Sequence, residues 1–182
     1  MPKARPNPPV IHLLVAMVVL LVPMLLIMAW FTRIPEPAVN LVDYRPVVAA
    51  ARQADPYPVA APASLPDGWL AIRARWTARG KLGVDREPVP GNTVELGFLS
   101  PDKRYFAVDQ RDEQPELFVA DVSRDGRPDG QSTVKGVAWT RYVSADRRTH
   151  SLARTGPGYV TLVSGDVPYQ DLEAFAATLV EQ

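Results

Sequence analysis

The sequence predicts an α+β protein: one N-terminal transmembrane helix, then a mostly antiparallel β-sheet domain closed by a C-terminal helix. Three observations lead to this prediction. Residues 10–31 are almost entirely apolar, apolar and polar side chains alternate in several segments of residues 69–164, and residues 168–179 carry an apolar stripe at helical spacing. A period of two is typical of half-buried strands, and a spacing of i, i+3, i+4 and i+7 is typical of a helix face.

The apolar run from Val10 to Phe31 predicts a helix that spans the membrane and is not removed. As a helix, its 22 residues extend about 33 Å, enough to cross a hydrocarbon core of about 30 Å. A cleaved signal has a shorter apolar region followed by a small-x-small site, and no such site closely follows Phe31. Lys3 and Arg5 precede the run without an acid, which predicts a plasma-membrane protein with a cytoplasmic N-terminus and an extracytoplasmic domain.

Pro23 lies near the middle of this span, and two interpretations of it stay open. Lipid-embedded helices tolerate proline, so the residue is either a tolerated kink or part of a shape fitted to a partner helix. In the second interpretation Pro23, Met24 and Met28 are candidate interaction residues.

The span divides the chain into a cytoplasmic tail at 1–9, the helix at 10–31 and a proline-rich extracytoplasmic arm at 32–68. Seven prolines in the arm exclude a continuous helix or a central strand. Residues 46–54 form its one plausible helix, with proline in the first turn. We expect the rest to be extended, as a standoff or a wrapping arm.

The folded domain is expected over 69–182 and begins with a strand at 69–79. Leu70, Ile72, Ala74 and Trp76 share one face of that strand. Residues 94–98 and 105–110 predict a hairpin around a turn at 100–103, with proline at its second position.

The middle of the domain is less regular. Residues 116–122 predict either a short strand or a helical turn, and residues 123–130 predict a loop. Residues 133–143 predict one strand in which Gly136 is a bulge. A second hairpin pairs 151–154 with 159–164, which brings the expected total to five to seven strands.

A helix closes the domain. Pro168 opens it, Asp166 is the expected cap, and the apolar stripe runs from Leu172 to Leu179.

Four segments together resemble the actinobacterial domain-of-unknown-function 4245 family: VDYRP (42–46), YPVAAPASLPDGW (57–69), Gly136-x-x-Trp139 and SGDVPYQDLEAFAATL (164–179). The resemblance covers nearly the whole chain. It implies a single-pass membrane or exported envelope protein and supplies no catalytic residues.

The residues themselves provide no catalytic or metal-binding constellation. There is no cysteine, and the domain has one histidine, His150, which we interpret as a surface residue. Asp109, Asp112, Glu113 and Glu116 predict a solvated loop, with a carboxylate pair for sugar chemistry as the alternative. We therefore expect no catalytic, cofactor or metal site.

A stripe of three arginines is the remaining candidate interaction surface. Arg73, Arg75 and Arg79 lie on one face of the first strand, where they meet lipid headgroups or an acidic partner, or else pair across strands with acids such as Glu95. Tryptophans 69, 76 and 139 are interpreted as core residues.

These features favour a non-catalytic accessory or scaffolding subunit of an envelope or respiratory membrane complex. A membrane tether raises the local concentration of a domain near a membrane partner. The expected partners are an integral membrane protein complex and the lipid bilayer. The acidic excess after residue 34 disfavours nucleic acid. The alternative is an extracytoplasmic module that binds lipid or a cell-wall precursor.

Overall fold

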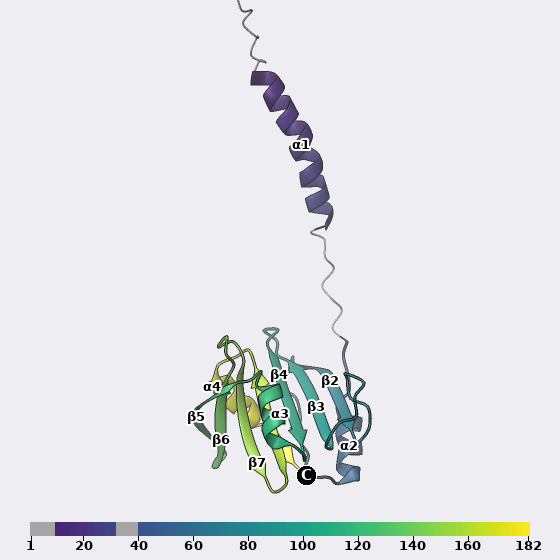
Figure 1. Ribbon diagram of the computed structural model, residues 1–182, viewed down its shortest axis with the longest axis vertical. Helices are drawn as coiled ribbons and strands as arrows, with labels where there is room; N and C mark the ends of the chain where they lie inside the picture. The colour runs from purple at the N-terminus through teal and green to yellow at the C-terminus, as the bar shows by residue number, and fades with distance from the viewer. Residues whose placement is uncertain (1–9, 32–39) are drawn as a thin grey trace, which may run out of the picture. The chain divides into compact units, whose positions relative to one another are not determined.

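The computed structural model describes residues 10–31 and 40–182 (Figure 1). The chain divides into two units, Met1–Ala38 and Val39–Gln182. In the first unit, helix α1 runs from Val10 to Phe31 and contains Pro23. Its stretch Ile11–Trp30 is long and apolar enough to cross a membrane, and none of it is buried. Length and composition fit a membrane anchor or a signal sequence alike.

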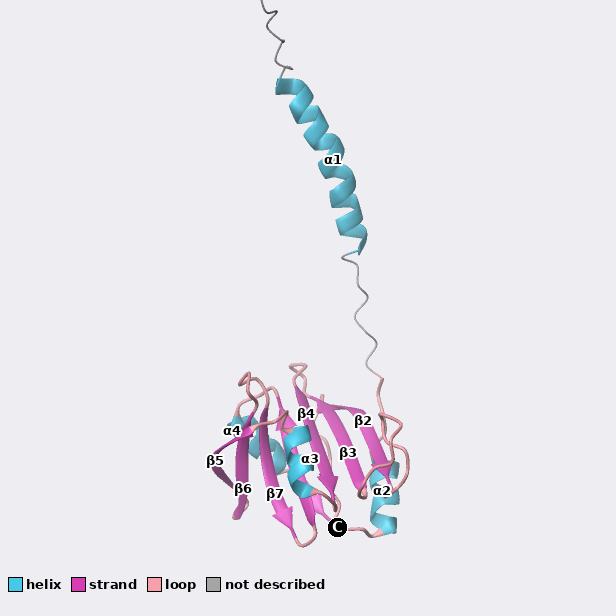
Figure 2. Ribbon diagram, in the orientation of Figure 1, coloured by secondary structure: helices cyan, strands magenta, loops and turns pink. Residues whose placement is uncertain are grey.

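A seven-stranded antiparallel sheet forms the frame of the second unit (Figure 2). Its strand order is β2-β3-β4-β8-β7-β6-β5. The strands are β2 (Leu70–Thr77), β3 (Thr93–Leu99), β4 (Tyr105–Arg111), β5 (Arg127–Val134), β6 (Val137–Val143), β7 (His150–Gly156) and β8 (Tyr159–Gly165). A separate two-stranded sheet pairs β1 (Ala60–Pro62) with β9 (Leu179–Glu181). The predicted α+β class is confirmed.

The two faces of the large sheet are covered unequally. One face packs against α2 (Arg45–Ala54), α4 (Tyr169–Ala176) and the small sheet, and these elements share one large apolar core. Of the helices described in residues 40–182, α3 (Pro115–Val122) alone covers the opposite face; it lies in front of the sheet in Figure 2, while α4 lies behind it. Phe118 of α3 forms a smaller cluster there with apolar residues of β7 and β8. The ambiguous segment 116–122 is therefore helical.

Aromatic rings fill the centre of the large core. Phe175 of α4 stacks on Trp69 with ring centroids 5.2 Å apart, and its ring also lies 5.2 Å from that of Phe106. Trp139 is buried, and Trp69 and Trp76 are partly buried against the same cluster. The prediction that the three tryptophans are core residues is confirmed.

The described part of the proline-rich arm belongs to the folded unit. The helix expected at 46–54 is present as α2, but its Val48 and Ala51 are buried in the core. β1 pairs with the last strand of the chain. The expected boundary at residue 69 is thus wrong, because proline limits regular structure without preventing burial. The predictions for residues 1–9 and 32–39 fall outside the described residues.

One buried side chain ties this segment to the sheet. Gln110 of β4 is fully buried, and its Oε1 accepts a hydrogen bond from the backbone N–H of Ala60 at 2.7 Å. Its Nε2 donates to the carbonyl oxygen of Pro58 at 3.2 Å and to Oγ1 of Thr161 at 2.8 Å. The Tyr57 hydroxyl donates to the Gln110 carbonyl oxygen at 3.1 Å. A residue from the middle of the sheet therefore satisfies backbone groups of the first residue of β1 and of the segment just before it.

Residues 127–143 form a hairpin, whereas the sequence predicts a loop followed by a single strand. β5 pairs antiparallel with β6. Lys135 and Gly136 connect the two strands, with φ of 49° and 78°. Two consecutive positive φ values are those of the turn that best matches the twist of a tight hairpin. Gly136 thus makes a turn instead of a bulge.

One irregularity in strand pairing lies in β2, and another lies in β5 between Pro128 and Gln131. The pairing of β2 with β3 shifts between Ala71 and Arg73. The extra residue turns Ala71 into the core and leaves Leu70 on the surface, 37% exposed. A uniform period of two therefore assigns Leu70 and Ile72 to the wrong face.

The end of the chain also differs from the prediction. α4 ends at Ala176, and Leu179 begins β9 instead of completing the helical stripe. Pro168 is the N-cap residue, whereas the Asp166 carboxylate accepts a hydrogen bond from the Thr149 hydroxyl at 2.6 Å.

Replacing Gln110 by alanine should lower the free energy of unfolding of residues 40–182 by about 2–4 kcal/mol. The substitution opens a cavity and leaves the Ala60 N–H and the Pro58 carbonyl without partners. Urea denaturation measures the loss. Gln131→Ala, at an exposed position of β5, is the matched control and should change stability by no more than about 0.5 kcal/mol. Equal losses of unfolding free energy in the two variants would contradict a stabilising role for the Gln110 hydrogen bonds.

Candidate functional site

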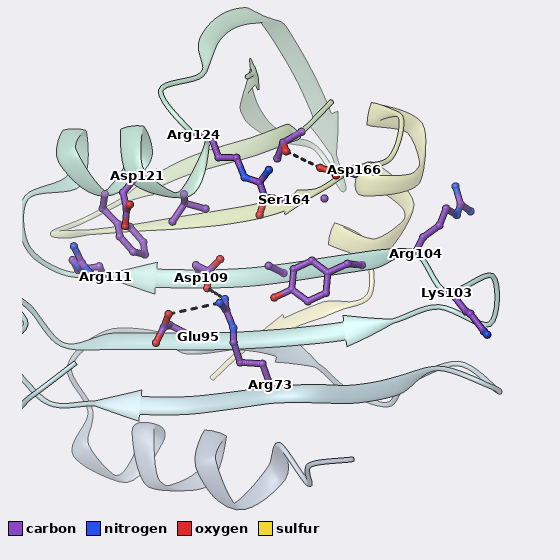
Figure 3. A pocket seen from close by; sticks show the side chains of 16 residues that line it. Arg73, Glu95, Lys103, Arg104, Asp109, Arg111, Asp121, Arg124, Ser164 and Asp166 are labelled. Carbon is purple, nitrogen blue, oxygen red and sulfur yellow. Dashed lines mark hydrogen bonds and ion pairs between the residues drawn. The ribbon is translucent and has the colours of Figure 1, made fainter. Parts of the chain in front are cut away.

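The part of the sheet that α3 leaves open carries a pocket of about 620 Å³ (Figure 3). Small residues make room for it. Gly97 of β3 pairs with Ala107 of β4, which pairs with Ser164 of β8, and the last two line the pocket. A Cβ on Gly97 would lie 2.7 Å from the Tyr105 hydroxyl, so the Tyr105 side chain lies across this row. The volume is within the range of about 300–1,000 Å³ that is usual for ligand sites.

Arg73 and Asp109 form the central ion pair on one side of the pocket. Nη2 of Arg73 donates to Oδ1 of Asp109 at 2.5 Å, and Nη1 lies 3.8 Å from Glu95 Oε1. In Figure 3 the Arg73 side chain extends from β2 across β3 to reach Asp109. Asp109 is only 4% exposed. This is a cross-strand pair in which the acid is buried and the arginine is partly exposed.

Burial raises the pKa of Asp109 from its ordinary 3.8 to about 7, although the Arg73 guanidinium acts to lower it. Glu95 and Asp121 add like charge in the same direction as burial, and Arg111 opposes it. The desolvation cost of a buried carboxylate thus exceeds the stabilisation that one ion pair supplies. Asp109 exchanges its proton near neutral pH.

The other side of the pocket is formed by α3 and the residues that follow it. The Arg111 guanidinium lies 4.2 Å above the Phe118 ring, and its Nε donates to Oγ1 of Thr93 at 3.1 Å. Arg124 follows α3, and its side chain points toward the strand that carries Ser164 (Figure 3). Within residues 10–31 and 40–182, neither Arg111 nor Arg124 has a carboxylate oxygen within 4 Å. The pocket thus combines paired and unpaired arginines.

These groups are suited to binding a polar ligand by ion pairs and hydrogen bonds. Guanidinium groups supply fixed donors, and Asp109 accepts or donates according to its protonation state. In the described part of the chain, no group of three or more histidine, cysteine, aspartate or glutamate residues is placed to hold a metal ion.

The structure separates the arginines of the predicted stripe. Arg73 lines the pocket. Arg75 lies 3.9 Å from Glu95, and Arg79, beyond the end of β2, contacts Glu113 at 2.6 Å. The alternative of pairing across strands is confirmed for Arg73 and Arg75, whereas Arg79 pairs with an acid outside the strands. The other candidates, Pro23, Met24 and Met28, belong to α1 in the separate first unit, where their side chains are exposed.

Two expectations about polar residues need correction. Asp109 is buried in β4, away from the solvated loop expected for its acidic cluster, because β4 extends to Arg111. His150 is half-buried instead of lying on the surface, and its ring meets that of Tyr169 edge-on with centroids 4.6 Å apart.

Sequence patterns did not single out Arg111 and Arg124 on the α3 side of the pocket. Asp109 and Arg111 alternate with Val108 and Gln110, so the period of β4 already places both charges on the face opposite the core. No comparable signal marks Arg124, whose position depends on the way α3 ends.

Asp109→Asn should remove a pH-dependent component of stability. Between about pH 4 and pH 7 the folded protein retains the Asp109 proton while the unfolded chain has released it. The free energy of unfolding of the wild type should therefore fall as the pH rises through this window, by about 4 kcal/mol at most for this group. The variant should lack this decline.

Urea denaturation of residues 40–182 at several pH values between 4 and 8 measures the difference. Asp67→Asn, at an exposed position outside the pocket, controls for the loss of a carboxyl group. Parallel pH profiles for wild type and Asp109→Asn would contradict the raised pKa.

Comparison with known proteins places the chain in a family. No curated protein matches the sequence. A chain in the solved complex structure of Pseudomonas aeruginosa MucA/MucB is similar over 69% of this chain, with 18% sequence identity and a TM-score of 0.37; the match spans 36% of that chain. Residues 5–179 match the family described as "Protein of unknown function (DUF4245)", in agreement with the resemblance seen in the sequence. The chain belongs to this DUF4245 family.

Proposed function

We propose that this protein is a membrane-anchored, extracytoplasmic accessory subunit of an envelope or respiratory membrane complex, without catalytic activity of its own. The observation that carries this proposal is the apolar helix Ile11–Trp30, none of which is buried in the protein. Exposed apolar surface of this length is unfavourable in water and favourable in a bilayer. A retained anchor keeps the attached domain beside a membrane partner and raises its effective concentration there.

The direction of insertion follows from charge. Lys3 and Arg5 precede the helix without an acid, which favours a cytoplasmic N-terminus. The apolar run is also longer than the roughly 7–15 residues of a cleaved signal. Both features support an extracytoplasmic position for Val39–Gln182.

A second candidate function is a ligand-binding module for lipid or a cell-wall precursor. The pocket beside α3 favours it, because unpaired arginines and a buried acid converge on one cavity of ligand size. The two functions are compatible, since an accessory subunit can present a bound ligand to its partner.

Protease added to intact spheroplasts should digest the domain and leave a fragment of α1 protected. An extracytoplasmic domain is accessible from outside, whereas lipid shields the span. Immunoblotting with tags at both ends measures the outcome. Digestion seen only in inverted vesicles would reverse the topology, and release of a soluble, shortened chain would identify α1 as a cleaved signal.

Replacing residues 10–31 by an unrelated apolar span should abolish co-purification of a stoichiometric partner in mild detergent. Pro23 inside the helix and the Met24 and Met28 side chains supply the shape that a partner helix would recognise. Arg75→Ala should weaken co-purification only mildly, and mainly at low salt, because exposed charges chiefly steer encounter. Full retention with the replaced span would move the interface to the domain, and co-purifying lipid without protein would favour the ligand-binding module.

A further inference from the structure

We propose that the pocket beside α3 binds a phosphate group, free or on a lipid head group, and that Arg124 is its main contact with Arg111 as the second. This inference rests on the proposed role of the domain as a binding module. It identifies the ligand chemistry of a pocket that has no assigned occupant.

The first support is the distribution of charge within the pocket. The acids on the β2 side are already engaged, because Arg73 pairs with Asp109 and lies near Glu95. Arg111 is half-buried, and burial lowers its pKa, yet no acid of the described chain lies within 4 Å of its guanidinium. Partly buried charges are unfavourable unless they are paired. Asp121 of α3 also lines the pocket and favours the charged form of Arg111, but from more than 4 Å away, so Arg111 and Arg124 face the cavity without an ion pair of their own.

The second support is the position of Arg124. The residue has φ of 57°, and the following N–H, of Asp125, donates to the carbonyl oxygen of Ala120 at 2.7 Å. This is the residue after the C-cap of α3, where glycine is favoured because a side chain strains the left-handed conformation. Arg86 and Lys135 share this conformation, so it assigns no role by itself; unlike their side chains, the side chain of Arg124 lines the pocket.

Phosphate fits this arrangement better than a carboxylate does. A phosphate presents several oxygens in different directions, and it can accept hydrogen bonds from two guanidinium groups at once. Arg111 comes from β4 and Arg124 from the loop after α3, so the two approach the cavity from different elements. The Ser164 hydroxyl, on the floor of the pocket, is a further donor.

Arg124→Gly tests the proposal with little risk to the fold. Glycine adopts the left-handed conformation without strain, so the variant should melt at the same temperature as the wild type or higher. The matched control is Arg86→Gly. Arg86 also has a positive φ, of 66°, but lies in the loop between β2 and β3 and does not line the pocket.

The measurement is isothermal titration of the full chain in dodecyl maltoside micelles, which contain no phosphate, at neutral pH in phosphate-free buffer. The probes are inorganic phosphate, glycerol 3-phosphate and dioctanoyl phosphatidylglycerol. We expect saturable binding to the wild type and to Arg86→Gly, and at least tenfold weaker binding to Arg124→Gly. Tighter binding of the lipid than of glycerol 3-phosphate would identify a lipid head group as the source, and equal binding would identify free phosphate.

Unchanged affinity in Arg124→Gly, or the absence of saturable binding for all three probes, would overturn the proposal. That failure is distinct from a failure of the proposed function. If the partner still co-purifies with Arg124→Gly and no probe binds to the wild type, only the ligand assignment is lost. If phosphate binds but the topology is reversed, the anchor proposal fails and the pocket assignment stands.

Discussion

The buried amide of Gln110 is the interaction on which the arrangement of the folded unit depends. It satisfies backbone groups at Ala60 and Pro58 and so holds the segment before β1 against the middle of the sheet. That segment then pairs with the last strand of the chain, and Val59 exchanges backbone hydrogen bonds with Gln182. Because both ends of the unit meet on one face, that face is covered by α2, α4 and the small sheet together.

The other face of the sheet is covered, among the helices of residues 40–182, by α3 alone. Much of the uncovered face is polar, and its charges are organised across strands: Arg73 of β2 reaches past β3 to a buried acid on β4. The same geometry that buries Asp109 raises its pKa, so a group that could have been a simple surface charge becomes sensitive to pH near neutrality. The row of small residues beside it keeps the surface hollow.

Much of this fold follows from local patterns, and the differences have identifiable physical causes. The apolar helix, α2 and the hairpins β3–β4 and β7–β8 were predictable because periodicity and turn residues act over a few positions. The packing of residues 40–62 was not, since it depends on long-range bonds to Gln110 and to the last strand. The β5–β6 turn was missed because Lys135 adopts a conformation that glycine usually supplies.

The site was less predictable than the fold for the same reason. The stripe of three arginines looked like one surface, but the strand ends at Thr77, and the three arginines pair with acids in different places. Arg73 pairs with Asp109 on β4, Arg75 with Glu95 on β3, and Arg79 with Glu113 in the loop after β4. What distinguishes Arg73 is the burial of its partner, which depends on the position of β4 in the middle of the sheet. The spacing of charged residues along one strand therefore identifies the face of the sheet on which they lie. Acids on other parts of the chain determine which of these charges remain free of an ion pair.

The unequal covering of the two faces separates stability from binding. The large aromatic core and the Gln110 hydrogen bonds lie on the face covered by α2, α4 and the small sheet, whereas the pocket lies on the face that carries α3. Polar residues that line the pocket, other than those of the Arg73–Asp109 pair, can therefore change with little effect on the large core. Arg124 illustrates this separation most clearly, because the fold would be served as well or better by glycine at its position. The fold does not need this side chain, which lies at a cavity lined by arginines and carboxylates and is therefore placed to contact a ligand.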